Sequence, residues 1–253
     1  MSNPNPYSAP SAELTNPVGE QEFALHPPRT VNAGQGVQWL VDGFNYFKQD
    51  AGTWIAICVI GFVLLIVLNL IPLVNFLVSF TAYVWMGGLM LGCKAQHDRE
   101  PLQINHLFAG FKEAFVPLLL LSIVIMVLIF VIMAICLGSA FMPLMGIGGE
   151  PDFASMGMGF MIGLLIAMAL IIPVSMAGWF APALIVLHKV PVIQAMKMSF
   201  QACMKNIVPF LLYGLVLFVL LIIAMIPFGL GMLVLGPVIY ASVFTAYKDI
   251  FVD

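Results

Sequence analysis

Four long stretches of this chain contain no Lys, Arg, Asp or Glu, and they constrain its fold more than any other feature. They cover residues 51–93, 114–149, 153–188 and 206–247. The chain is 62% hydrophobic and only 8% charged, against roughly 25% charged residues in soluble domains. A water-soluble fold could not bury this much apolar side chain, so lipid has to cover it. The sequence therefore predicts an all-α membrane protein.

The lengths of these stretches predict how often the chain crosses the bilayer. A helix needs roughly 20 residues for one crossing. The first and last stretches are long enough for two crossings, and Pro-containing segments at 71–75 and 226–229 break them in the middle. The middle stretches predict one crossing each, at about 117–137 and 157–187, joined by a Gly- and Pro-rich connection over 138–156. We therefore expect six transmembrane helices.

The positive charges predict the orientation. With six crossings, every Lys and Arg lies in a segment on the same side of the membrane. The positive-inside rule places that side in the cytoplasm, so we expect a bacterial inner-membrane protein with both termini cytoplasmic. The nine basic residues are Arg29, Lys48, Lys94, Arg99, Lys112, Lys189, Lys197, Lys205 and Lys248.

An amphipathic pattern recurs three times, each time directly before a predicted hairpin of two crossings. Its apolar residues follow the spacing of one helical stripe, with polar residues on the other face. We therefore predict three parallel repeats, at about 37–93, 101–188 and 191–248, each a short cytoplasmic interfacial helix followed by a hairpin. The stripes consist of Leu40, Phe44 and Phe47 in the first copy, Ile104, Phe108 and Phe111 in the second, and Met196, Phe200 and Cys203 in the third.

The chain divides into a tail and one membrane domain. Residues 1–36 contain six prolines among Asn, Ser and Glu, a composition typical of a disordered segment. We expect this tail to be cytoplasmic and residues 37–253 to form a single membrane domain.

Three short motifs carry a resemblance to known proteins. They are Trp39-x3-Gly43-Phe44-x2-Phe47, Phe180-x-Pro182-x-Leu184 and Pro191-x3-Ala195-Met196-x2-Ser199-Phe200-x5-Asn206. They resemble an uncharacterised family of proteobacterial six-span inner-membrane proteins over roughly residues 30–250. More distantly, the chain is similar to YciC-like proteins and to the membrane domain associated with glycerophosphodiester phosphodiesterases. The resemblance implies an inner-membrane location and the same layout, without an activity.

Residues that could carry chemistry are few. No charge lies within the predicted spans, where charges usually mark an ion path. The sequence has no nucleophile–base constellation, no phosphate loop and no metal-ligand spacing, so we expect no catalytic residue, cofactor or metal. Its net charge of −3 gives no basic excess for nucleic acid. Pro173 and Pro182 interrupt the fourth predicted span, either as a static kink or as a hinge beside a cavity near Ser175.

These observations leave two functional hypotheses. We favour a non-enzymatic protein that organises lipids or a membrane-protein partner, which includes a second copy of this chain. The alternative is a transporter or channel for a neutral or amphipathic small molecule, with a path beside the fourth span. An intramembrane enzyme is the least supported reading, because no acid, base or nucleophile converges within the spans.

Overall fold

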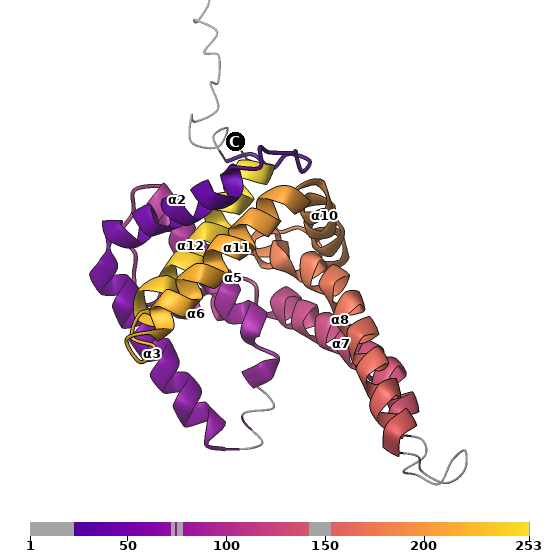
Figure 1. Ribbon diagram of the computed structural model, residues 1–253. Helices are drawn as coiled ribbons and strands as arrows, with labels where there is room; N and C mark the ends of the chain where they lie inside the picture. The colour runs from indigo at the N-terminus through magenta and orange to yellow at the C-terminus, as the bar shows by residue number, and fades with distance from the viewer. Residues whose placement is uncertain (1–22, 72–73, 75–77, 142–152, 253) are drawn as a thin grey trace, which may run out of the picture.

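The computed structural model of the protein describes residues 23–71, 74, 78–141 and 153–252. Regular structure in these ranges is α-helical (Figure 1). Long apolar helices and shorter helices both occur along the chain. In chain order the helices are α2 (Gln35–Gln49), α3 (Ala51–Asn69), α5 (Ala82–His97), α6 (His106–Glu113), α7 (Phe115–Phe141), α8 (Phe153–Trp179), α9 (Ala181–His188), α10 (Val192–Lys205), α11 (Ile207–Met225) and α12 (Met232–Phe251).

Five helical segments in the described ranges are long and apolar enough to cross a membrane. In four of them only 11–22% of the residues are buried inside the protein, whereas in the fifth, at the C-terminus, 61% are buried. These four segments therefore present bare apolar surface, which lipid must cover. The segments are Ala51–Asn69, Phe115–Gly138, Gly157–His188, Ile207–Met225 and Met232–Phe251.

The second predicted span has no full-length counterpart among these five. It corresponds to α5, whose 16 residues are fewer than the roughly 20 that cross a bilayer core. Residues 72–73 and 75–77, which include part of the predicted break, lie outside the described residues. The predicted break at 226–229 does separate α11 from α12, and there Phe228 and Gly229 adopt positive φ angles of 53° and 81°. Most of the predicted loop 138–156 lies outside the described residues, although α7 extends to Phe141 and α8 begins at Phe153.

The core lies at one end of the molecule, where the short helices meet the ends of the long ones. Along α7, Leu118 and Leu121 are fully buried, whereas Phe130 and Ile135 are 73% and 71% exposed. The α7–α8 hairpin and the far end of α3 extend away from this core as separate arms (Figure 1). A water-soluble core would cover such residues, so the exposed arms indicate the part of the fold that lipid surrounds.

Each of the short helices α2, α6 and α10 packs against helices other than the one that follows it. Helix α6, which leads into α7, packs on α5. Helix α10, which leads into α11, packs on α8 and α9. Helix α2, which leads into α3, packs on α12 and α11 and so joins the N-terminal part of the chain to its C-terminal helix (Figure 1).

A single residue separates each of these helices from the apolar helix that follows it. These residues are Asp50, Ala114 and Asn206, and all have an extended φ with a small positive ψ. Their φ/ψ angles are −150°/65°, −154°/38° and −123°/35°. The same backbone bend thus redirects the chain from a short helix into a long one at three places.

The N-terminal segment differs from the predicted disordered tail where the structure describes it. Residues 35–36 already belong to α2, and residues 23–34 are bound to the core. The backbone N–H groups of His26 and Arg29 donate to the carbonyls of Phe251 and Ile250 at 2.7 and 3.1 Å. Proline-rich composition misled the prediction here, because these contacts come from residues more than 200 positions away. Residues 1–22 of the predicted tail lie outside the described residues.

Candidate functional site

Helix α2 has three distinct faces. One face is buried on α12 and α11 and includes Trp39, Leu40 and Gly43. A second face is polar. The third face is apolar yet exposed: Val37, Val41 and Phe44 are 38%, 48% and 42% exposed. The buried face differs from it in packing on α12 and α11. An exposed apolar stripe beside a polar face is the arrangement of a helix lying in a membrane interface.

The close contact between α2 and α12 depends on a glycine. A Cβ atom added to Gly43 would lie 2.7 Å from the Val238 carbonyl oxygen and 2.8 Å from the Ser242 nitrogen. Only a residue without a side chain allows the two backbones to approach this closely. The Thr245 hydroxyl also donates to the Trp39 carbonyl at 3.1 Å.

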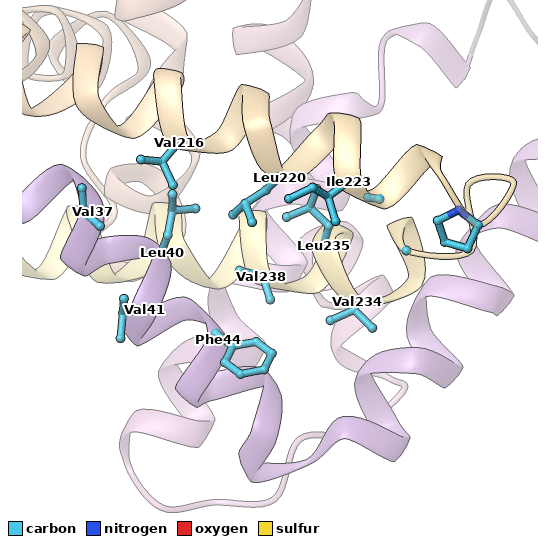
Figure 2. A pocket seen from close by; sticks show the side chains of 13 residues that line it. Val37, Leu40, Val41, Phe44, Val216, Leu220, Ile223, Val234, Leu235 and Val238 are labelled. Carbon is cyan, nitrogen blue, oxygen red and sulfur yellow. The ribbon is translucent and has the colours of Figure 1, made fainter.

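An apolar groove lies between the exposed stripe of α2 and the α11–α12 hairpin (Figure 2). Its volume is about 490 Å³, within the range of small-molecule sites. No side chain that lines it is polar, so it suits a hydrocarbon rather than a hydrogen-bonding ligand. The lining residues are Val37, Leu40, Val41, Phe44, Val216, Leu220, Ile223, Ala224, Pro227, Gly231, Val234, Leu235 and Val238.

The predicted stripes are divided between the protein core and the exposed surface. Leu40 and Phe47 on α2 are buried, as are Met196 and Cys203 on α10. Phe111, on α6, is partly buried against the Trp85 ring, with ring centroids 5.1 Å apart. The remaining stripe residues face outward, with exposures of 42% for Phe44, 42% for Ile104, 37% for Phe108 and 36% for Phe200.

A second pocket of about 490 Å³ lies between α3, α5 and α12. Helices α3 and α5 diverge in Figure 1, and side chains with polar groups line the space between them, among them Asn69, Ser79 and Tyr240. The alternative hypothesis placed a cavity beside the fourth span near Ser175. Ser175 is instead exposed on α8 and lines neither of these two pockets.

The two prolines of the fourth span occupy different positions. Pro173 lies inside α8, whereas Pro182 lies in the first turn of α9, a position that suits proline. The chain therefore breaks at Phe180, between the two helices. The Ser199 hydroxyl of α10 reaches into this break and bonds both the Phe180 N–H and the Met176 carbonyl.

Basic residues from separate parts of the chain meet around the N-terminal segment. The Lys94 ammonium lies 4.4 Å from the centre of the Phe23 ring, and that ring stacks on His188 at 5.7 Å. The Lys205 ammonium donates to the Pro28 carbonyl at 2.8 Å. Arg29 forms an ion pair with Asp249 at 3.1 Å. These contacts place basic residues from three segments of the chain at the same end of the molecule.

Burial shifts the pKa values of titratable groups at this end, among them those of the His106 ring and the Cys203 thiol. Burial of the His106 ring lowers its pKa, and the negative charge of Glu100 opposes this only in part. The neutral ring fits the geometry, because its Nδ1 accepts the Gln103 N–H at 3.0 Å. Burial also raises the pKa of the Cys203 thiol to about 12, so this thiol is a packing group rather than a nucleophile.

Within the described residues, no three His, Cys, Asp or Glu side chains gather closely enough to hold a metal ion. No sequence pattern predicted a functional role for Ser199, Gly43 or Phe23. Gly43 and Ser199 each lie three residues after the first residue of a stripe, Leu40 and Met196 respectively. A small residue at this shared position could have indicated a close contact between helices. Phe23 carried no signal, because its partners are distant in the chain.

The comparisons with known proteins agree with the membrane location that the exposed apolar arms indicate. A protein of Burkholderia thailandensis, named a probable inner membrane protein, is 29% identical to this chain over 225 residues. The match covers 83% of this chain and 82% of that protein. The chain is a multi-span helical membrane protein. No protein-family model matches this chain, and no solved structure matches it either.

Proposed function

We propose that this protein is a non-enzymatic component of the bacterial inner membrane that organises lipids at the cytoplasmic interface. The proposal comprises six spans in three parallel repeats, with both termini in the cytoplasm. The similarity to a protein named a probable inner membrane protein supports the location. The shared position of basic residues at one end of the molecule supports the orientation, since positive residues favour the cytoplasmic side.

One observation carries the proposal. Phe44, Phe108 and Phe200 occupy the same position in the three aligned stripes, and all three remain 36–42% exposed. Each lies seven residues before the start of an apolar helix, at Ala51, Phe115 and Ile207 respectively. A phenylalanine kept at the surface of a short helix that leads into the membrane fits the boundary between headgroups and acyl chains.

The repeat arrangement has two further supports. The bends at Asp50, Ala114 and Asn206 have similar backbone angles and precede the three apolar helices α3, α7 and α11. Each short helix also packs on the last helix of the hairpin before it, and α2 closes the series by packing on α12. In this arrangement α5 takes the same place in the first repeat as α8 and α12 take in the other two, which makes it part of the second span.

Native mass spectrometry of the full chain, released from nanodiscs formed with its own membrane lipids, tests this function. The proposal predicts that phospholipid molecules stay bound to the protein in defined numbers. Release of the protein without any lipid would contradict it. A stoichiometric second protein in place of lipid would instead favour the organisation of a protein partner.

A second candidate function is transport of a neutral or amphipathic molecule. The observation that favours it is the pocket between the diverging helices α3 and α5, where Asn69, Ser79 and Tyr240 add polar groups to an apolar wall. Flux of a small neutral solute into proteoliposomes tests this function, with a Gly61→Trp variant that fills the pocket as the comparison. Equal flux through both proteins and through empty liposomes would reject transport of that solute.

A further inference from the structure

We propose that the groove between α2 and the α11–α12 hairpin binds one acyl chain of an anionic phospholipid, whose headgroup phosphate pairs with Lys48. This inference rests on the proposed function, because it identifies the lipid class and the site at which the protein holds it. The groove, its rim and its single positive charge carry the argument.

The apolar length of the groove fits a chain within one leaflet. Its wall on α11 extends from Val216 to Ala224, which is about 12 Å at 1.5 Å per residue, and one leaflet of the hydrocarbon core is about 15 Å thick. Val216, Leu220 and Ile223 form one side and Val234, Leu235 and Val238 the other (Figure 2). A bound acyl chain would cover both sides without leaving a polar group unpaired.

The charge at the rim selects the headgroup. Phe44 lines the groove on α2, and the Lys48 ammonium lies 5.1 Å from the centre of the Phe44 ring. The ammonium therefore lies where the apolar wall ends, one helical turn beyond Phe44. Since no acidic side chain lines the groove, the local field favours a lipid phosphate with a net negative charge over a zwitterionic headgroup.

Lipid titration by native mass spectrometry tests the site on the purified full chain. The probes are phosphatidylglycerol and phosphatidylcholine with identical acyl chains, and the readout is the apparent dissociation constant of the first bound lipid. We expect Lys48→Gln to weaken phosphatidylglycerol binding about fivefold and to leave phosphatidylcholine binding unchanged. Lys112→Gln removes a positive charge from the corresponding turn of α6, away from the groove, and should change neither.

A pair of tryptophan variants tests the groove itself. Val234→Trp fills the groove and should weaken binding of both lipids about tenfold, because it displaces the acyl chain. Val234 is 37% exposed, so the larger ring does not have to enter the core. Val219→Trp adds the same ring at a 48% exposed position of α11 outside the groove and should leave both constants unchanged.

Four results would overturn the proposal. Equal affinity for the two lipids together with no effect of Lys48→Gln would reject the headgroup assignment. Unchanged binding to Val234→Trp would place the lipid elsewhere, and the proposed function would still stand. A dimer that Val234→Trp converts to a monomer would assign the groove to a second copy of the chain. Absence of any bound lipid on the unmodified protein would reject the proposed function as well.

Discussion

The Ser199 hydroxyl donates to the Met176 carbonyl at 2.6 Å and, through the same oxygen, accepts the Phe180 N–H at 2.9 Å. In a continuous helix the Phe180 N–H would bond the Met176 carbonyl itself, four residues earlier. Instead α8 ends at Trp179 and α9 begins at Ala181, with Pro182 in its first turn. Ser199 therefore replaces one lost helical hydrogen bond with two bonds from a neighbouring helix.

Replacing Ser199 with alanine should destabilise the protein measurably. The change leaves the Phe180 N–H without its partner at a fully buried position, and each such group costs about 1–3 kcal/mol. We expect Ser199→Ala to lower the unfolding temperature in mild detergent, followed by intrinsic tryptophan fluorescence. Ser175→Ala removes an exposed hydroxyl from α8 and should melt like the unmodified protein. Equal melting of both variants would contradict the bridging role.

A methyl group at Gly110 should separate α6 from α5. A Cβ atom there would lie 2.0 Å from the Val84 carbonyl oxygen and 3.0 Å from the Gly88 nitrogen, so the two backbones would have to move apart. We expect Gly110→Ala to cost about 1–3 kcal/mol of stability in chemical unfolding. At Gly214, in α11, an added Cβ meets no atom within 4 Å, so Gly214→Ala should be neutral or stabilising. If the two variants unfold alike, α5 and α6 are not in the close contact described.

Removal of Asp249 should cost more than removal of its ionic partner. The Asp249 carboxylate accepts from Arg29 at 3.1 Å and from the Trp39 indole N–H at 2.9 Å. Arg29 is 47% exposed in its side chain, so its ion pair contributes below about 1 kcal/mol. Asp249→Ala also leaves the indole of the buried Trp39 without a partner. We expect Asp249→Ala to unfold at a lower temperature than Arg29→Ala in thermal melts. A lower unfolding temperature for Arg29→Ala would contradict the importance of the Trp39 bond.

The course of the chain could be read from the sequence where local physics decides it. The long apolar stretches and the break at 226–229 became α3, α7, α8, α11 and α12 because apolar length and proline act within a few residues. The amphipathic pattern also placed α2, α6 and α10 before apolar helices. These features depend on neighbours in the chain, which a sequence displays directly.

The division of each stripe could not be predicted, because it depends on helices distant in the sequence. Leu40 and Phe44 belong to one predicted stripe, yet only Leu40 is buried, since α12 covers that side of α2. The groove could not be predicted for the same reason, because it requires α2 to lie beside α11 and α12. The stacking of Phe23 on His188 likewise joins residues that are distant in the chain. The cavity expected near Ser175 rested on proline positions alone, and the break at Phe180 is filled by Ser199.

The thiol of Cys203 should resist modification in the folded protein. It is buried and directed at the Met176 carbonyl, 3.6 Å away, and burial raises its pKa to about 12. At pH 8 the reactive thiolate is therefore scarce as well as covered. A maleimide should label an added Gln201→Cys thiol within minutes and Cys203 only after denaturation in SDS. Labelling of Cys203 at the rate of the added thiol would show that α10 leaves α8 in solution.

The depth of Phe44, Phe108 and Phe200 in a lipid bilayer tests the central claim most directly. Spin labels placed singly at these positions in nanodiscs report their relative exposure to oxygen, which concentrates in lipid, and to a water-soluble nickel chelate. We predict that all three lie about 5–10 Å inside the headgroup boundary, while a label at Asn45 on the polar face of α2 lies in water. Three labels as accessible to the nickel chelate as the one at Asn45 would contradict it.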